Sequence, residues 1–153
     1  MAYEDVRRSI VSTNLLTQFA AARGVAPAQT LVGTGITVEM LDQPKVEVAA
    51  SQELAVVRNI VRHLGHIPGI GLDAGLRYHL SAYGIWGFAL LTSPSYRSAA
   101  DIATRYLDLS YAFVRLVLAP RGRDVALLFD ERGLPEDVRQ FLLERDFAAW
   151  ANA

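Results

Sequence analysis

Aromatic side chains are concentrated between residues 78 and 88, and they are the residues of this chain best suited to recognising a small molecule. The members are Tyr78, Tyr83, Trp86 and Phe88. Aromatic rings supply large apolar walls, and tyrosine and tryptophan add a polar tip, which is the composition of a small-molecule pocket. Ordinary core packing would use the same residues, so the pattern leaves both interpretations open.

His79 lies inside this aromatic stretch. The spacing of apolar residues predicts a helix over residues 72–83, and His79 falls on its apolar stripe beside Leu76, Leu80 and Tyr83. A polar ring in such a stripe needs a partner, because burying it unpaired is costly. It could therefore be a core histidine bonded to a backbone carbonyl, a pocket group that contacts a ligand, or a catalytic base.

No arrangement of residues indicates catalysis or a metal centre. His63 and His66 are three residues apart, as two ligands on one helix face can be, but Gly65 lies between them at a helix end. We expect both to face solvent near a helix C-terminus, where positive charge is favoured. The chain has no cysteine, which excludes disulfides and thiolate zinc sites. Nucleophile-elbow, zinc-protease and phosphate-loop spacings are missing too, so we expect no enzyme, no metal and no cofactor.

Charged residues follow the polar side of a second predicted helix, which Ser93 and Pro94 should open and which should run to about Leu109. Its polar side carries Arg97, Asp101, Arg105 and Asp108. Pairs four residues apart on a helix surface contribute only about 0.2–0.5 kcal/mol each. A solvated charged face explains them, and Arg105 as the anchor for a ligand carboxylate is the alternative.

The bulk composition fits one globular domain. The chain has 153 residues, 52% of them hydrophobic, and a net charge of −1. Direct binding to DNA phosphates would require a basic face, which this balance does not predict. No apolar run reaches the roughly 18 residues that span a membrane, and the N-terminus lacks a secretory signal, so we expect a cytoplasmic protein with no membrane partner.

The remaining elements are predicted from hydrophobic periodicity and from the glycine and proline residues that end helices and form turns. Helices are expected over about 6–23, from Pro27, over 51–64 and from about 135 to 149, with the segment 84–91 read as a strand or tight connection. Ser51 should cap the helix over 51–64. The predicted buried faces are Leu54, Val57, Ile60, Val61 and Leu64 on this helix and Val138, Phe141, Leu142 and Ala149 on the last one. Two apolar runs at 113–119 and 125–129 flank Pro120–Asp124 and predict a β-hairpin with a loop of about five residues. Because both runs are apolar on both faces, we expect the hairpin to be covered. The order predicts an α+β fold, with amphipathic helices on a small antiparallel sheet.

Five segments of the chain resemble the N-terminal effector domain of AraC-type transcription regulators, the branch labelled arabinose-binding. They are residues 31–36, 51–59, 68–75, 84–94 and 105–109. The resemblance implies a cupin-like barrel, as in the arabinose regulator, whereas the helical spacing predicts an α+β domain that is not a cupin jelly roll. We follow the helical spacing.

The resemblance also implies a function. Such domains bind a small-molecule effector and act on a C-terminal pair of helix-turn-helix units, which residues 1–153 do not include, so we expect an N-terminal sensing or dimerisation domain truncated at its C-terminal end. DNA would be contacted only through that absent half, and a homodimer is left open. We expect the effector to contact His79, Tyr83, Trp86, Phe88 and Tyr106. A purely structural dimerisation module without a ligand is the alternative.

Overall fold

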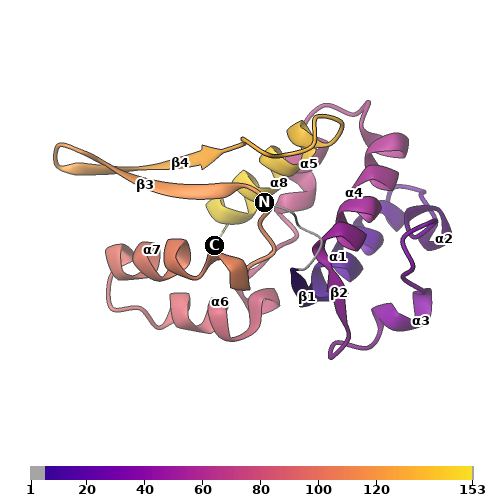
Figure 1. Ribbon diagram of the computed structural model, residues 1–153, viewed down its shortest axis with the longest axis horizontal. Helices are drawn as coiled ribbons and strands as arrows, with labels where there is room; N and C mark the ends of the chain where they lie inside the picture. The colour runs from indigo at the N-terminus through magenta and orange to yellow at the C-terminus, as the bar shows by residue number, and fades with distance from the viewer. Residues whose placement is uncertain (1–5, 153) are drawn as a thin grey trace.

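The computed structural model describes residues 6–152. The first half of this range forms a helical lobe, seen on the right of Figure 1. Its elements are β1 (Arg7–Ser9), α1 (Val11–Ala21), α2 (Pro27–Thr30), α3 (Val38–Leu41), β2 (Glu47–Ala49) and α4 (Ala50–Leu64). The second half contains α5 (Ile70–Gly75), η2 (Leu80–Tyr83), α6 (Gly84–Leu91), α7 (Tyr96–Arg105), η3 (Leu107–Leu109), β3 (Arg115–Arg121), β4 (Asp124–Asp130) and α8 (Arg139–Ala151).

The helical lobe follows most of the sequence prediction. The first helix begins at Val11 rather than residue 6, because Arg7–Ser9 pairs with Glu47–Ala49 as an antiparallel ribbon. Helix α4 buries Leu54, Val57, Ile60 and Leu64 of the predicted stripe, and Val61, its remaining member, is half-buried. Its start is fixed by Gln52, whose Oε1 accepts a hydrogen bond from the Ala49 amide at 3.0 Å, and not by the predicted Ser51 cap.

Helices α5 and α8 pack face to face (Figure 1). Gly71 and Gly75, one turn apart on α5, lie against the α8 backbone, where a Cβ on Gly71 would come within 2.5 Å of the Phe141 carbonyl oxygen. The glycines of the 69–75 segment therefore serve close helix packing at these two positions. α8 buries its predicted inner face of Val138, Phe141, Leu142 and Ala149.

The predicted helix over 72–83 was wrong. α5 ends at Gly75, the backbone is extended at His79 (φ −105°, ψ 155°), and a short 3-10 helix follows. The core takes Tyr78, which is off the predicted stripe, and its hydroxyl lies 2.8 Å from the Ser12 Oγ. The chain must turn at this point to bury that ring, so tertiary packing overrides the local period.

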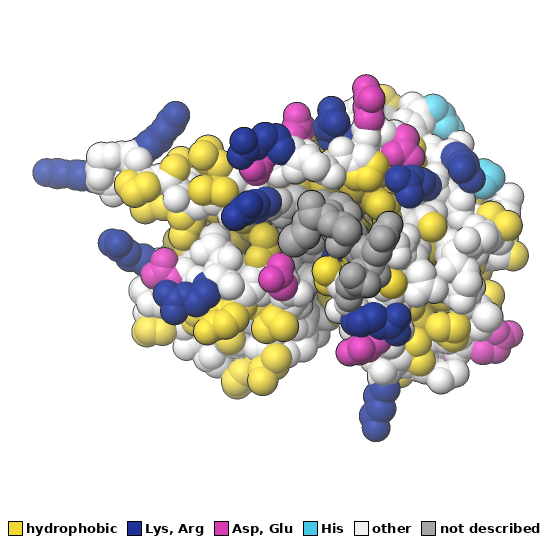
Figure 2. Space-filling view, in the orientation of Figure 1, with side chains coloured by type: hydrophobic (Ala, Val, Ile, Leu, Met, Phe, Trp, Pro, Cys, Tyr) yellow, Lys and Arg dark blue, Asp and Glu magenta, His cyan; other side chains and the backbone are white. Residues whose placement is uncertain are grey.

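The segment 84–91 is a helix, so its prediction as a strand or connection was wrong. α6 buries Trp86 and Leu90 and leaves Ile85, Phe88 and Leu91 exposed. The next helix, α7, stops at Arg105, earlier than predicted, and its cap is Ser95, whose Oγ accepts from the Ser98 amide at 3.1 Å. Figure 2 shows exposed hydrophobic side chains over α6 and along the hairpin.

The β-hairpin is confirmed, with two differences. Arg121 pairs with Asp124, so the turn is only Gly122 and Arg123, and Gly122 adopts a φ of +61° that favours glycine. The expectation that the hairpin would be covered was wrong, since Val117, Val125 and Leu128 are 41–56% exposed. The predicted α+β class is confirmed: the described strands form two two-stranded antiparallel sheets among helices.

Candidate functional site

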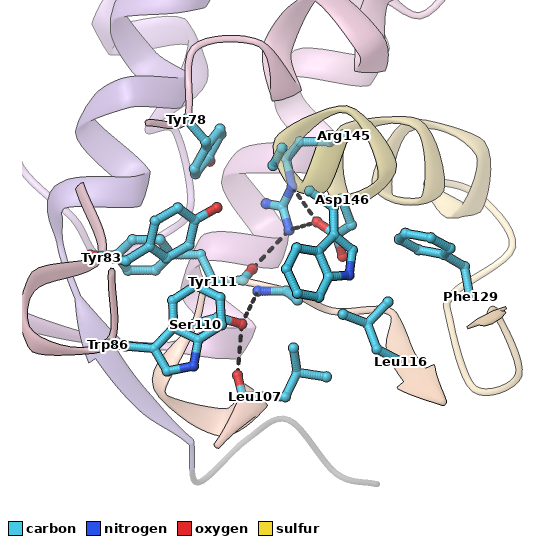
Figure 3. Close-up of a pocket in the computed structure, with 13 residues that line it drawn as sticks. Tyr78, Tyr83, Trp86, Leu107, Ser110, Tyr111, Leu116, Phe129, Arg145 and Asp146 are labelled. Carbon is cyan, nitrogen blue, oxygen red and sulfur yellow. Dashed lines mark hydrogen bonds and ion pairs between the residues drawn. The ribbon is translucent and has the colours of Figure 1, made fainter. Parts of the chain in front are cut away.

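An aromatic recess lies in the second half of the molecule, among η2, α6, α8 and the hairpin (Figure 3). Its ring walls are Tyr78, Tyr83, Trp86, Tyr111, Phe129 and Trp150. Tyr83 is central, with ring centroids 5.1 Å from those of both Trp86 and Tyr111. The cavity volume is about 30 Å³, enough for a water molecule but about tenfold below the smallest volume typical of small-molecule sites. The indole N–H groups of Trp86 and Trp150 are buried and have no hydrogen-bond partner among residues 6–152.

Arg145 and Asp146 line the base of this recess and, with Arg8 and Glu53, form what is called here the charge cluster. Arg145 is 1% exposed, and its Nε donates to Asp146 Oδ1 at 2.8 Å. Its Nη1 reaches Glu53 Oε1 at 3.4 Å, which ties α8 to α4. Ser12 donates a second hydrogen bond to the same Glu53 oxygen at 2.7 Å. Burial alone would lower the pKa of Arg145, but Asp146, Tyr78 and Glu53 outweigh it and raise the pKa, so this arginine remains charged.

The charge cluster holds the segment 110–114, called here the connecting segment, which joins η3 to β3. The Tyr111 carbonyl accepts from Arg145 Nη2 at 2.8 Å and from Arg8 Nη1 at 3.1 Å. Asp146 Oδ2 accepts from the amides of Phe113 at 2.8 Å and Val114 at 2.9 Å. The position of the hairpin therefore depends on ionic contacts made inside the core.

A larger groove adjoins the recess between α7, η3 and β3. Its volume is about 640 Å³, within the range of about 300–1,000 Å³ that small-molecule sites occupy. The groove and the recess share the wall formed by Leu107, Ser110, Ala112 and Leu116. The connecting segment thus runs between the two cavities.

The five residues predicted to contact an effector are divided by the structure. Tyr83 and Trp86 line the recess. His79 is exposed, and its Nδ1 is 3.4 Å from the Asn152 amide nitrogen, so its placement on a buried stripe was wrong. Phe88 is 65% exposed and Tyr106 is 50% exposed, and neither lines the recess or the groove.

The sequence prediction missed the charge cluster, although a signal was present. Glu53 precedes Val57, Ile60 and Leu64 at spacings of four, three and four, so it lies on the buried stripe of α4. Arg145 follows Leu142 by three residues and precedes Ala149 by four, so it lies on the buried stripe of α8. Opposite charges on two buried stripes indicate a buried ion pair, because neither charge could be buried alone.

No group of three or more metal-binding side chains is found within residues 6–152. His63 and His66 are both exposed at the end of α4, as predicted. In the same range, no helix has the length and apolar character needed to cross a membrane.

The buried tyrosines predict a loss of stability in alkali. Burial raises the pKa of the hydroxyls of Tyr78, Tyr83 and Tyr111. Unfolded tyrosine ionises near pH 10, so above that pH the unfolded chain releases protons that the folded chain retains. We expect the free energy of unfolding to fall above pH 10, by up to about 1.4 kcal/mol per pH unit for each tyrosine. Urea unfolding across pH 9–11 measures this slope, and Tyr83→Phe should make it shallower; an unchanged slope in that variant would contradict the assignment.

Comparison with known proteins identifies the family. Residues 24–153 match the family described as the arabinose-binding domain of AraC transcription regulator, N-terminal. Two curated relatives, HTH-type transcriptional regulators of Mycobacterium bovis and Mycobacterium tuberculosis, are each 37% identical over 144 residues. The match covers 94% of this chain but only 42% of each relative. No solved structure matches the chain. Because the family match spans most of the sequence, the chain belongs to the N-terminal domain family of AraC transcription regulators.

Proposed function

We propose that this domain binds a small-molecule effector and passes its occupancy to a DNA-binding domain elsewhere in a bacterial, cytoplasmic regulator. The observation that carries the proposal is the pair of adjoining cavities, a groove of about 640 Å³ and an aromatic recess, separated by the connecting segment. A ligand in the groove contacts the outer side of this segment. Its other side lines the recess, where we keep Tyr83 and Trp86 as proposed contacts for a part of the effector that enters the recess.

The two orphan indole groups support the use of the recess by a polar atom. Trp86 and Trp150 each bury an N–H donor that lacks a partner among the described residues. Such a donor loses the hydrogen bond that water would have provided, which costs about 1–3 kcal/mol. An oxygen acceptor, from a ligand or a water beside it, would satisfy these donors.

Transmission requires a difference in affinity between two arrangements of the domain. An effector shifts a conformational equilibrium only by as much as its affinity differs between the two states. The connecting segment suits this role because four hydrogen bonds from the charge cluster hold it and because it leads directly into β3. A ligand that moves Leu107 or Leu116 would move the start of the hairpin. The response of a separate DNA-binding domain to this movement, and its contact with DNA, are part of the proposal.

A panel of metabolites tests the proposal by thermal unfolding. A compound present at one hundred times its dissociation constant should stabilise the domain by about 2.7 kcal/mol. Both tryptophans of the chain line the recess, so binding should also change the intrinsic fluorescence. Stabilisation with no fluorescence change in any hit would place the effector site elsewhere, and no stabilisation across the panel would contradict effector sensing.

A structural dimerisation module is the second candidate. The exposed face of α6, formed by Ile85, Phe88 and Leu91, is 65–82% accessible and apolar, which is unusual on a monomer surface. Sedimentation of the domain without added metabolites distinguishes the two. A stable dimer together with a silent metabolite panel would favour this second function.

A further inference from the structure

The groove carries an excess of positive charge that the aromatic recess lacks. Its lining includes Arg8, Arg105, Arg115 and Arg132, against a single carboxylate, Asp108. The chain as a whole has a net charge of −1, so this excess is local. Positive charge concentrated in a concave site raises the local concentration of anions.

Two of the four arginines, Arg132 and Arg8, already have hydrogen-bond or ion-pair partners, and a third, Arg115, lies near a carboxylate. Arg132 is held by Asp130 through two hydrogen bonds, from Nε at 2.8 Å and from Nη2 at 2.7 Å. Arg115 lies opposite Asp130 in the hairpin and forms no ion pair within residues 6–152, but its charge helps to lower the pKa of the Asp130 carboxyl. Arg8 donates to the Tyr111 carbonyl and lies 4.4 Å above the Phe113 ring.

Arg105 is different. It is exposed at the last turn of α7, and within residues 6–152 its guanidinium makes no ion pair or hydrogen bond, not even with Asp108 three residues later. Its five N–H donors are therefore open to a ligand. A guanidinium presents these donors as a planar fork that matches a carboxylate.

Apolar side chains make up much of the remaining wall. Leu107, Val114 and Leu116 lie along η3, the connecting segment and β3, and Val114 and Leu116 are buried. A ligand without an apolar portion would leave the half-buried Leu107 and the 41% exposed Val117 of this groove in contact with water. The groove is thus charged at Arg105 and apolar along the wall that it shares with the recess.

We propose that the groove between α7, η3 and β3 binds an organic anion with an apolar body, and that Arg105 contacts its anionic group while Leu107 and Leu116 contact the body. Arg8 lines the same groove, but it is buried and Glu53 Oε1 lies 3.8 Å from its Nη1, so its charge is already balanced. This inference rests on the proposed effector function and narrows the class of effector. A neutral sugar or an organic cation would not use the free guanidinium.

Three probes of one chain length isolate the charge: octanoate, 1-octanol and octylammonium. Each is titrated into the domain while tryptophan fluorescence is followed, with calorimetry as a second readout. We expect octanoate to bind at least about tenfold more tightly than 1-octanol, because a hydrogen bond between charged groups contributes at least that much affinity. Octylammonium should bind most weakly. Raising the salt concentration should weaken octanoate binding only.

Two variants of α7 locate the contact. Arg105→Gln should weaken octanoate about tenfold and leave 1-octanol unchanged. Arg97→Gln is the matched control, because Arg97 is an exposed arginine on the same helix that does not line the groove, and it should change neither. Equal weakening by both variants would mean a general surface effect and would overturn the role of Arg105.

The outcomes separate this inference from the proposed function. If 1-octanol or octylammonium binds as tightly as octanoate, the preference for anions is wrong while effector sensing stands. If none of the three binds but the metabolite panel yields a neutral or cationic effector, the inferred class is wrong. If the panel and all three probes are silent, both proposals fail together.

Discussion

Replacing Arg145 with methionine is expected to lower the free energy of unfolding by about 3–5 kcal/mol, because it leaves Asp146 buried without its cation and leaves Glu53 with Arg8 alone, 3.8 Å away. Glu53 and Asp146 are 0% and 6% exposed, so solvent cannot replace the lost guanidinium. The variant also removes the Nη2 hydrogen bond to the Tyr111 carbonyl. Since the free energy of unfolding of a domain is only about 5–15 kcal/mol in total, the variant should lose a large share of its stability.

Urea unfolding measures this loss, with Arg97→Met as the control on an exposed arginine. The control should change stability by no more than about 0.5 kcal/mol. If Arg145→Met does not fold, Arg145→Lys is the second variant. Lysine keeps the positive charge but lacks the planar guanidinium, so its loss of stability should be smaller than that of methionine. A loss for Arg145→Met no greater than that of the control would show that the charge cluster does not support the fold.

Replacing Gly75 with alanine is expected to destabilise the protein by about 1–3 kcal/mol through overpacking. The new Cβ would overlap the Arg145 carbonyl oxygen and lie 2.6 Å from the Ala148 Cβ. The first of these is a backbone atom of α8, so relief requires the two helices to separate. That separation would also displace Arg145 and Asp146, which lie on the same turn of α8.

The sign of this change discriminates between two explanations of the glycine. Gly75 lies in α5 with no positive φ, so helix propensity alone predicts that alanine stabilises, by up to about 1 kcal/mol. Steric contact predicts the opposite, with a further loss for Gly75→Val. Denaturant unfolding of both variants decides, and a more stable Gly75→Ala would contradict the close packing of α5 on α8.

The sequence predicted correctly those elements that hydrophobic periodicity and turn residues determine. The stripes of α4 and α8 and the position of the hairpin follow from periodicity and turn residues, and they are confirmed. The helix over 72–83 failed because burial of Tyr78 against Ser12 is a long-range contact with no local signature. The segment 84–91 failed because a short apolar run fits a strand or a helix equally well.

The candidate site was predicted only in part. The concentration of rings identified the recess, and Tyr83 and Trp86 line it. The charge cluster was missed because Arg8, Glu53 and Arg145 are far apart in sequence and meet only after folding. The groove could not be predicted either, since its arginines come from β1, α7, β3 and the turn after β4.

The most direct test of effector sensing is to map the bound compound by amide NMR. The metabolite that stabilises the domain most is added to the 15N-labelled protein, and chemical-shift changes are recorded for every assigned amide. The account predicts changes centred on residues 107–118, including the Phe113 and Val114 amides that Asp146 holds. Changes centred on α1 to α4, with residues 107–118 unaffected, would contradict it.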